Sequence, residues 1–544
     1  MKNKFFLSII LLFIAVFLTR CASVVPPNGG PKDVVAPILT SSDPTNNSKN
    51  FNQKSFTIGF NEFIKLDNVE EQLIITPSLK TKPNVKIKGK TIVVKFEDNL
   101  ESNTTYSFNF GESIKDITEG NSASNLKYIF STGAYIDSSK ISGVVFDAYN
   151  EKPIPSMIVM LYKNNTDSLP LTQMPNYITK SNNSGRFLFT NVKPGKYKIF
   201  ALIDKNANFI YDLPNESLAF VDTIVSTYDT LGIEMKMSSF IEELRDIKIM
   251  NKSAMQYGKI MLTFNKQFDS LSFKDLLPNK NTFIFEPGVK KDTMLIWIKP
   301  STIDSMKLMV LNNNIIVDTV ELKLLPKDPP KNSRRGSNKE VVFGAIPLFN
   351  ANSFDLNKAF AIRTFAPIET FDKSKTIFIC DKDTLIDFKF SFNNVKSLFF
   401  IENNWKENTD YQIIFMPGSF TDILGTTNDT LIYKFKTREI SYYAQLFMDL
   451  SLSKTQGKSV IIQFLNDKDQ ILFEESINTN QKINLPFQNP GKYKLKAIID
   501  ENGNGKWDTG NYREKRQPEK VLFYKEEILL RSNWDVEVKW DISN

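Results

Sequence analysis

Short apolar runs that end at Asn, Asp, Gly or Pro follow one another along nearly the whole chain, about ten residues apart. Ser55–Phe60 and Thr91–Phe96 are examples, and apolar side chains recur at alternate positions within each. A period of two residues is that of a β-strand with one buried face. Turn signals at this spacing are typical of sandwiches and barrels. No long amphipathic helix is evident, so the sequence predicts an all-β chain, and its 544 residues predict several domains.

Two internal repeats organise the chain. Pro194–Lys198 recurs as Pro490–Lys494, and the Asn-Thr-Thr-Tyr of residues 103–106 recurs as the Asn-Thr-Asp-Tyr of residues 408–411. Each copy of the second repeat is followed by Asp-Ile and closes on a Phe-x-Thr strand. Repeats of this kind predict a duplicated two-domain unit. A further Ig-like sandwich at 238–326 and a polar linker at 327–342 separate the two copies.

Residues 37–135 resemble the bacterial Ig-like domain typified by S-layer proteins. The matching segments are Phe60–Ile64, Ile75–Pro77, Asn103–Tyr106 and the closing Phe130–Gly133. Residues 343–439 carry a weaker copy of the same pattern. The resemblance implies an Ig-like β-sandwich in both places, and it implies no catalytic centre.

Residues 140–236 resemble the carboxypeptidase regulatory-like domain, a transthyretin-type sandwich. The segments that carry the likeness are Ile141–Val145, Pro153–Pro155, Ser184–Phe187 and Val192–Tyr197. We expect Gly185 and Gly195 to permit hairpin turns with positive φ. Residues 441–544 keep the Pro-Gly-Lys-Tyr turn but lack the Ser-Gly-Arg-Phe segment, and we predict a second transthyretin-like sandwich there. The predicted fold is therefore a series of tandem Ig-like and transthyretin-like β-sandwiches.

The N-terminus predicts export. Lys2 and Lys4 precede the apolar run Phe5–Leu18, which is shorter than the roughly 20 apolar residues of a membrane span. The following Leu-Thr-Arg-Cys resembles the lipobox of bacterial lipoproteins, which implies a signal peptide at 1–20 and a lipidated Cys21. Arg20 departs from that pattern, because Gly, Ala or Ser normally stands there. An uncleaved membrane anchor is the alternative, and both interpretations leave the body outside the cytoplasm.

Residues 21–36 are rich in Pro and Gly and predict a tether between the lipid and the first domain. The order of Cys21, Pro-Pro-Asn-Gly-Gly-Pro-Lys-Asp, Ig-like domain and regulatory-like domain resembles a lipoprotein family of the Bacteroidota. The resemblance implies a lipid anchor in the outer membrane. It leaves open whether the protein faces the periplasm or the cell surface.

Composition restricts the chemistry. The chain contains no histidine, which excludes Ser-His-Asp and Cys-His catalysis and every zinc site that needs imidazole. The net charge of +7 is spread over 68 basic and 61 acidic residues without a long basic block, so nucleic-acid binding is not predicted. Cys380 lies in an apparent strand and is expected to be a buried structural thiol. The nearest carboxylate pair for catalysis, Glu70 with Glu71, is typical of a charged loop.

One motif carries metal chemistry. Residues 500–508 have oxygen donors at alternating positions and Gly505 at the sixth, which resembles the first half of a calcium loop. The expected ligands are Asp500, Asn502, Asn504, the Lys506 carbonyl and Asp508, while Asn511 replaces the usual bidentate Glu and Glu514 is a candidate substitute. The sister loop has Asp204, Asn206, Asn208, the Ile210 carbonyl and Asp212. Phe209 stands in place of the glycine, and a non-glycine residue is expected to resist positive φ there. A hairpin held by Asx turns is the alternative for both.

Three functions remain open on the sequence. The first is a non-catalytic structural or adaptor lipoprotein of the envelope, an accessory subunit of an outer-membrane protein complex. The second is a glycan-binding lipoprotein, although the tryptophans, which include Trp297, Trp405, Trp507 and Trp534, occur singly in apparent strands or turns and favour packing roles. The third is an enzyme with paired carboxylates, for which no pair stands out.

Overall fold

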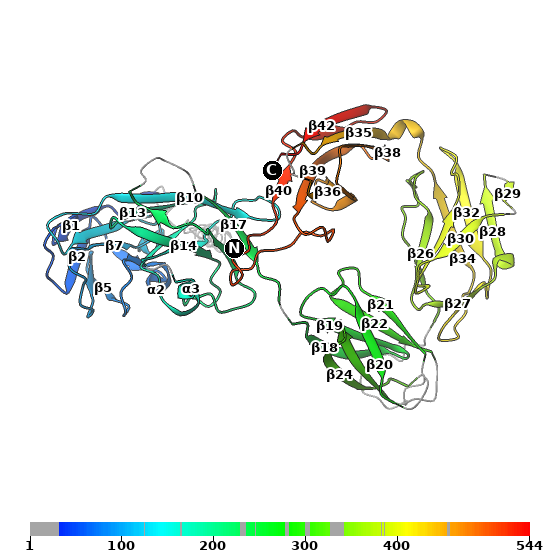
Figure 1. Ribbon diagram of the computed structural model, residues 1–544, viewed down its shortest axis with the longest axis horizontal. Coiled ribbons are helices and arrows are strands. Elements are labelled where there is room, and N and C mark those ends of the chain that lie inside the picture. The colour runs from blue at the N-terminus through cyan, green and yellow to red at the C-terminus, as the bar shows by residue number, and fades with distance from the viewer. Residues whose placement is uncertain are drawn as a thin grey trace, which may run out of the picture. The chain divides into compact units, whose positions relative to one another are not determined.

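The computed structural model describes residues 32–543 except 125, 164–165, 229–234, 245, 278–281, 300–304, 327–341, 382, 386 and 454–456. The described chain is built almost entirely of antiparallel β-strands, which confirms the predicted fold class (Figure 1). The predicted signal peptide, Cys21 and most of the 327–342 linker lie outside the described residues. None of the helices in the described part has the length and apolar character needed to cross a membrane.

The chain divides into two compact units. The first unit contains residues up to Val145 together with Pro153–Asp212 and Leu218–Met237. The second contains Phe146–Lys152, Leu213–Ser217 and the chain from Ser238 onwards. Five large hydrophobic cores occur in the described residues, and we call the sandwich around each one a module, numbered in chain order.

The first module packs two sheets around a core rich in Phe and Tyr. One sheet has the order β1-β2-β6-β5, the other has the order β4-β7-β9, and β3 pairs with β8 beside them. The elements are β1 (Leu39–Asp43), β2 (Ser55–Phe60), β3 (Ile64–Leu66), α2 (Val69–Gln72), β4 (Ile74–Thr76), β5 (Asn84–Lys88), β6 (Thr91–Lys95), β7 (Thr105–Asn109), β8 (Ile114–Asp116) and β9 (Lys127–Ser131). Glu70 and Glu71 are exposed on α2, as expected of a charged surface segment.

The second module follows the order β12-β11-β14-β15-β17-β10-β13, with β16 paired to β14. Its elements are β10 (Ser139–Asp147), β11 (Ile158–Tyr162), α3 (Leu169–Thr172), β12 (Tyr177–Lys180), β13 (Arg186–Val192), β14 (Lys196–Leu202), β15 (Ser217–Phe220), β16 (Val225–Ser226) and β17 (Met235–Ile241). Strand β17 runs across the boundary predicted at 236–238. The other domain boundaries stay predictions.

Two glycines of the second module behave differently. Gly185 has φ of 71°, and a Cβ there would lie 2.3 Å from the Val145 carbonyl oxygen, so only glycine fits. Gly195 is not among the residues with positive φ, so that expectation was wrong. A Cβ at Gly195 would lie 3.5 Å from the Tyr197 ring. Both copies of the Pro-Gly-Lys-Tyr turn place a tyrosine ring at this distance, since a Cβ at Gly491 would lie 3.5 Å from the Tyr493 ring. The Tyr197 hydroxyl donates to the Lys193 carbonyl, as the Tyr493 hydroxyl does to the Asn489 carbonyl.

The third module has the sheets β18-β19-β22-β21 and β20-β23-β24. Its strands are β18 (Ile249–Gln256), β19 (Lys259–Phe264), β20 (Leu271–Asp275), β21 (Phe283–Pro287), β22 (Thr293–Ile298), β23 (Ser305–Asn312) and β24 (Ile315–Lys323). Alternation of buried and partly exposed positions along β19 and β22 fills the core from both sheets.

The fourth module has the sheets β25-β26-β31-β30 and β29-β28-β32-β34, with β27 paired to β33. Its elements are β25 (Ala345–Pro347), β26 (Phe360–Thr364), β27 (Ile368–Phe371), η1 (Lys373–Lys375), β28 (Thr376–Cys380), β29 (Asp383–Leu385), β30 (Lys389–Phe392), β31 (Leu398–Glu402), β32 (Asp410–Phe415), β33 (Phe420–Asp422) and β34 (Leu431–Lys436). Cys380 is a free, buried thiol at the end of β28, as predicted.

The fifth module follows the short helix η2 (Ile440–Tyr442). Its sheets are β38-β35-β42 and β37-β36-β39-β40, with β41 also on β39, and β35 and β42 run parallel. The strands are β35 (Ala444–Ser451), β36 (Ser459–Asn466), β37 (Ile471–Ile477), β38 (Gln481–Gln488), β39 (Gly491–Asp500), β40 (Val521–Phe523), β41 (Ile528–Leu530) and β42 (Asp535–Asp541).

The repeated Asn-Thr-x-Tyr and Phe-x-Thr motifs of the first and fourth modules are structural. Asn103 has φ of 48°, and Asn408 has the same value, in the left-handed region that Asn tolerates best after Gly. The backbone N–H of the following threonine donates to the hydroxyl of the Phe-x-Thr threonine in both copies, at 3.0 Å and 2.9 Å. The repeat is therefore explained by one turn geometry that anchors the last strand of the first and of the fourth module.

The Asp-Ile motif has an equally local role. The Asp116 carboxylate is buried and accepts the backbone N–H groups of Glu119, Gly120 and Asn121. Burial alone would raise the pKa of Asp116, but these hydrogen bonds outweigh it and lower the pKa to about 2. Asp422 holds the equivalent turn by accepting the N–H groups of Leu424 and Thr426.

Candidate functional site

The loop of residues 500–508, here the second Asp/Asn loop, begins where β39 ends. The buried Asp500 carboxylate accepts the backbone N–H groups of Gly503, Asn504 and Gly505 at 2.7, 3.2 and 2.9 Å. Gly503 and Gly505 have φ of 73° and 76°, and a Cβ at either position would meet nothing within 4 Å. Glycine adopts this left-handed conformation without strain, and neither position is restricted by space.

Three of the predicted calcium ligands converge in this loop. The side-chain amide nitrogens of Asn502 and Asn504 both donate to Oδ2 of Asp508, at 2.5 Å and 2.8 Å. An amide that rotates by half a turn presents oxygen to the same point, since the two ends of the group have nearly the same shape. Asp500 points its oxygens at backbone N–H groups instead. Lys506 pairs its ammonium with Asp269 at 2.7 Å, which leaves its carbonyl as the predicted donor.

The first Asp/Asn loop, residues 204–212, has nearly the same geometry. The amides of Asn206 and Asn208 donate to the two carboxylate oxygens of Asp212 at 3.0 Å and 2.8 Å. The Phe209 N–H donates to Asp204 as the Gly505 N–H does to Asp500. The sequence led us to expect that phenylalanine resists positive φ, yet Phe209 has φ of 58°. That conformation costs about 1–2 kcal/mol for an L-residue, and the loop's hydrogen bonds offset it.

A buried glutamate near each loop was missed by the sequence analysis. Glu519 accepts the N–H groups of Glu501 and Asp508 on its two carboxylate oxygens, at 2.7 Å and 2.9 Å. Burial raises the pKa of Glu519, and the nearby Asp508 and Asp500 carboxylates raise it further. Glu216, also fully buried, accepts the Leu213 N–H in the first copy. A Pro followed closely by Glu before the next strand was the available signal, and it is weak.

The second Asp/Asn loop supplies some, but not all, of the oxygen ligands that a hard cation needs. Asp500, Asp508 and Glu519 bring three carboxylates into electrostatic contact, and the nearby Lys506 and Lys458 pair with Asp269 and Glu501. Among the described residues, however, no three acidic, His or Cys side chains are grouped closely enough to hold a metal by themselves. A cation would therefore need the Asn amide oxygens and a backbone carbonyl. Glu514, the candidate twelfth-position ligand, is exposed and lies 3.7 Å from Arg516.

The third and fourth modules meet at a buried carboxylate. Oε2 of Glu286, on β21, accepts the Trp297 indole N–H at 2.9 Å, and Oε1 accepts the Ser397 hydroxyl of the fourth module at 2.6 Å. The Arg363 guanidinium lies 3.7 Å away. Trp297 also belongs to an apolar cluster with Ala366, Ile423 and Leu424 of the fourth module, against which Tyr257 and Ile284 pack. The sequence analysis did not find this junction.

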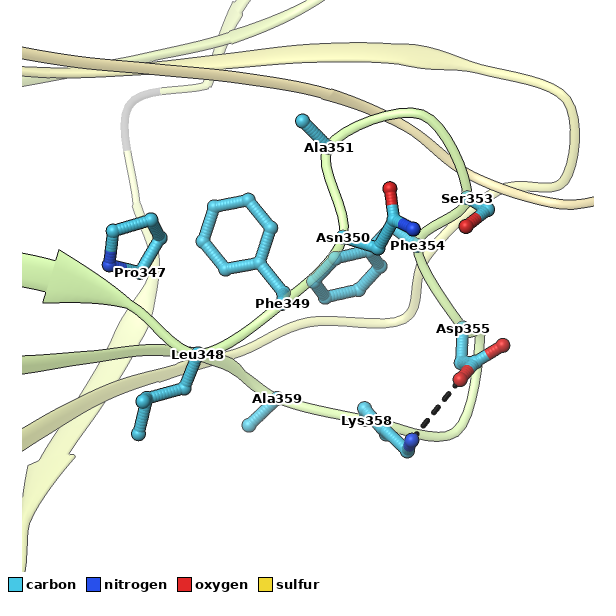
Figure 2. Close-up of a pocket in the computed structure, with 10 residues that line it drawn as sticks. All are labelled: Pro347, Leu348, Phe349, Asn350, Ala351, Ser353, Phe354, Asp355, Lys358 and Ala359. Carbon is cyan, nitrogen blue, oxygen red and sulfur yellow. Dashed lines mark ion pairs between the residues drawn. The ribbon is translucent and has the colours of Figure 1, made fainter. Parts of the chain in front are cut away.

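The fourth module has a hollow of about 650 Å³, and Figure 2 shows the residues that line it. It is lined by residues 347–351, 353–355, 358 and 359, and the ammonium of Lys358 lies 3.0 Å from the Asp355 carboxylate at its rim. Asp355 also contacts Arg438 at 3.3 Å and the Tyr443 hydroxyl at 3.3 Å. The charged groups of this hollow thus serve the connection between the fourth and fifth modules.

The predicted tryptophan roles are largely as expected. Trp297 and Trp405 are buried, Trp507 and Trp540 are partly buried, and Trp534 is 57% exposed. The Trp405 indole N–H donates to the Lys358 carbonyl and the Trp507 indole N–H to the Glu519 carbonyl. Trp534 is the one exposed tryptophan of the described chain, and the Arg531 guanidinium lies over its ring, 5.3 Å from the ring centre.

Comparison with known proteins identifies one of these modules. Residues 33–132 match the family model of the bacterial Ig-like domain. The match covers the first module and agrees with the resemblance seen in its sequence. It is to an Ig-like family and not to a catalytic one. No curated protein matches the chain.

Several solved structures align with the chain at low similarity. The S-layer protein SbsC has 13% identity and a TM-score of 0.14, and the alignment covers 86% of this chain and 66% of that one. The major pilin subunit of Bacillus cereus has 10% identity and a TM-score of 0.14, with coverage of 75% and 99%. An α2-macroglobulin fragment from Escherichia coli has 11% identity and a TM-score of 0.18, with coverage of 36% and 97%. At these TM-scores the likenesses carry no argument about activity or partners.

Proposed function

We propose that the protein is a non-catalytic lipoprotein that acts as a structural adaptor of the cell envelope. The observation that carries this proposal is the Glu286 junction, where one module contributes a buried carboxylate and its neighbour contributes the Ser397 hydroxyl that it binds. Burying a charge between modules is costly unless it is hydrogen-bonded, so such a junction favours one fixed arrangement over a flexible linker. Two modules held in this way would present their surfaces to a partner in one fixed arrangement.

The remaining parts of the proposal concern the location of the protein in the cell and its binding partner. We infer lipid attachment at Cys21, a location at the outer membrane, and association with an outer-membrane protein complex. Support comes from the charged and apolar N-terminal segments and from the resemblance to Bacteroidota lipoproteins. Which face of the membrane the modules occupy is left to experiment.

The test is co-purification from detergent-solubilised membranes. The full-length protein is expected to remain with the membrane fraction and to bring down an integral outer-membrane protein. Cys21→Ala is expected to release it from the membrane fraction, because the lipid is lost while the modules are unchanged, and Cys380→Ala serves as the matched control. A Cys21→Ala protein that stays fully membrane-bound would support the uncleaved anchor instead. Recovery of the wild-type protein alone would contradict the adaptor function.

Glycan binding is the second candidate, favoured only by exposed Trp534. A single aromatic face provides one stacking contact, whereas sugar capture usually requires more than one side chain around it. Binding to a glycan array that is lost in Trp534→Ala would favour this function. If the Trp534→Ala variant still co-purifies with the membrane-protein partner, the adaptor function is supported.

We also propose that calcium stabilises the second Asp/Asn loop, and the first one less strongly. The amide oxygens of Asn502 and Asn504 would join Asp508 and the Lys506 carbonyl around the cation, and Asp500 would complete the site. Calcium would supply charge neutralisation for three neighbouring carboxylates and would fix the loop. Its role is structural, and no reaction depends on it.

Calcium is expected to raise the melting temperature of the full-length protein. Extracellular calcium modules bind with dissociation constants near 10⁻⁴–10⁻³ M, so 10 mM calcium against a 1 mM constant gives about 1.4 kcal/mol. Scanning calorimetry with calcium or with EDTA measures the shift. Asp508→Asn should abolish most of it, and Asp212→Asn should abolish less. An identical melting curve with calcium and with EDTA for the wild-type protein would leave the loops as hairpins held by Asx turns.

A further inference from the structure

The first module contains a long hairpin whose tip lies beside the start of the described chain. Strands β7 and β9 pair along their length, and the pairing continues as far as the Asp116 N–H, which donates to the Asn121 carbonyl at 3.0 Å. Residues 117–120 therefore form the tip of the hairpin, and Thr105, the first residue of β7, marks its base. The Asn121 amide donates to the Asp33 carbonyl at 3.0 Å, which holds the start of the described chain against the tip.

Exposed apolar side chains gather at this end of the module. We call them the tip patch, and each member is more than half exposed: Val34, Val35, Ile38, Phe63 and Ile117. The Ile117 N–H donates to the Phe63 carbonyl, next to the buried pair of Ile64 and Asp116, so the side chains of Phe63 and Ile117 point outward together. Ile38 lies beside them because it exchanges two hydrogen bonds with Asn61. Apolar side chains that are exposed as a group mark a surface for binding a protein or a membrane.

Lysines stand at the rim of the tip patch. The Lys90 ammonium donates to the Asn61 carbonyl at 2.7 Å and lies 5.3 Å from the centre of the Phe63 ring. Lys65 is exposed on β3, and a Cβ at Gly120 would lie 3.7 Å from its ammonium nitrogen, which places that ammonium at the tip. Lysines beside apolar side chains suit a membrane surface, where the ammonium groups reach lipid phosphates while the apolar groups enter the boundary of the acyl chains.

Acidic groups balance these lysines. Glu119 pairs with Lys32 at 3.7 Å, and the Asp33 carboxylate accepts the Val35 N–H at 2.9 Å. Glu62 precedes Phe63 in the chain. Electrostatic attraction to an anionic surface is therefore small, and the apolar side chains would supply most of the binding free energy.

The path of the chain places this patch at the end of the module nearest to Cys21. The chain leaves the module at the base of the hairpin, where the Asp137 N–H donates to the Thr105 hydroxyl at 2.8 Å. At the tip, eleven residues, 21–31, separate Cys21 from the described chain. A segment of that length reaches at most about 40 Å and spans about 17–20 Å as a flexible coil. A lipid on Cys21 would thus keep the tip patch within a short distance of the membrane.

We propose that the tip patch docks on the lipid bilayer that holds the Cys21 lipid. Phe63, Ile117 and Ile38 enter the boundary between headgroups and acyl chains, and Lys65 and Lys90 face the phosphates. The inference rests on the proposed lipid attachment and adds a second membrane contact, which orients the first module relative to the membrane. A partner protein is the other conceivable occupant. The position of the patch at the tethered end favours lipid, because a bilayer lies within reach of the tip in every anchored molecule.

The test places a dye at the tip of the anchored protein. Full-length Cys380→Ala protein, purified with its lipid, is reconstituted into vesicles of phosphatidylethanolamine and phosphatidylglycerol that contain nitroxide-labelled lipid. The dye NBD is attached through Ile117→Cys or, as the matched control, through Tyr135→Cys. Ile117 and Tyr135 are both 54% exposed, but Tyr135 follows the base of the hairpin. We expect the nitroxide to quench the dye at the tip by about half or more and the control dye by less than about a tenth, because a docked apolar side chain enters the acyl boundary.

A second substitution separates docking from tethering. Phe63→Glu places a carboxylate in the patch, so quenching at Ile117→Cys should fall to the level of Tyr135→Cys while the lipid still holds the protein on the vesicles. Ile432→Glu is the matched control, since Ile432 is 54% exposed on β34 of the fourth module, and it should leave quenching unchanged. Sedimentation of the vesicles checks that each variant stays attached, and circular dichroism checks its strand content.

The remaining outcomes distinguish this inference from the proposed function. Equal quenching at the two dye positions, or quenching that Phe63→Glu leaves unchanged, would overturn membrane docking while the lipid anchor stands. Shielding of the dye in native membranes but not in vesicles would identify a partner protein as the occupant and would also overturn it. Uptake of dye by Cys380→Ala protein without an added cysteine would show a free thiol at Cys21, and it would overturn the lipid attachment together with the docking that rests on it.

Discussion

Glu286→Ala is expected to lower the free energy of unfolding of the third and fourth modules by about 2–4 kcal/mol, because the substitution leaves two buried donors without an acceptor. The Trp297 indole N–H and the Ser397 hydroxyl both lose their carboxylate partner, and both residues are buried. Removal of the negative charge should also lower the pKa of Lys259 further, since burial already lowers it and Glu286 counteracts that effect.

Calorimetry and denaturant unfolding of the full-length protein measure this effect. If the junction couples the modules, their unfolding should separate into distinct transitions in Glu286→Ala and remain coupled in the wild-type protein. Glu321→Ala is the matched control, since Glu321 lies in the same module, is 67% exposed and pairs with Lys307 on the surface. Its effect should stay within about 0.5 kcal/mol. Equal effects of the two substitutions would contradict a stabilising junction and weaken the proposed adaptor.

The strands were predictable because each depends on its own local pattern. Alternation along segments such as Ser55–Phe60 specifies which side chains enter a core, and the structure buries Phe56, Ile58 and Phe60 accordingly. The repeated turns were predictable for the same reason, although their mechanism required coordinates. The positive φ of Asn103 and the hydroxyl of Thr132 become meaningful only when the last strand is seen to lie beside the turn.

Contacts between modules could not be predicted in this way. Glu286 and Ser397 are 111 positions apart, and neither lies in a motif that marks a buried ion. The expectation that Phe209 avoids positive φ was wrong. The local preference against that conformation is about 1–2 kcal/mol, which is smaller than the sum of several hydrogen bonds. Glu519 was missed because a charged residue before a strand is usually exposed, and its burial follows from two N–H groups supplied by the loop.

Phe130→Ala is expected to lower the free energy of unfolding of the first module by about 3–5 kcal/mol. Phe130 has no exposed surface and stacks on Phe51 at 3.8 Å and on Tyr106 at 5.6 Å between ring centres. Alanine removes a whole ring from this aromatic cluster, and neighbouring rings of fixed shape cannot collapse into the space. Urea unfolding followed by tyrosine fluorescence measures the loss, and Ile87→Ala on β5, where the side chain is 39% exposed, should cost less than about 1 kcal/mol.

The equivalent substitution in the fourth module tests whether the repeated aromatic pair contributes the same free energy of unfolding in both copies. Phe435 stacks on Tyr411 at 5.5 Å, close to the 5.6 Å of Phe130 and Tyr106, so Phe435→Ala should cost a similar 3–5 kcal/mol. Because the two rings belong to separate cores in separate compact units, each substitution should shift the unfolding of its own unit and leave the other transition in place. A loss in one unit that also destabilised the other would show coupling between the units, and the modules would then act as one cooperative body.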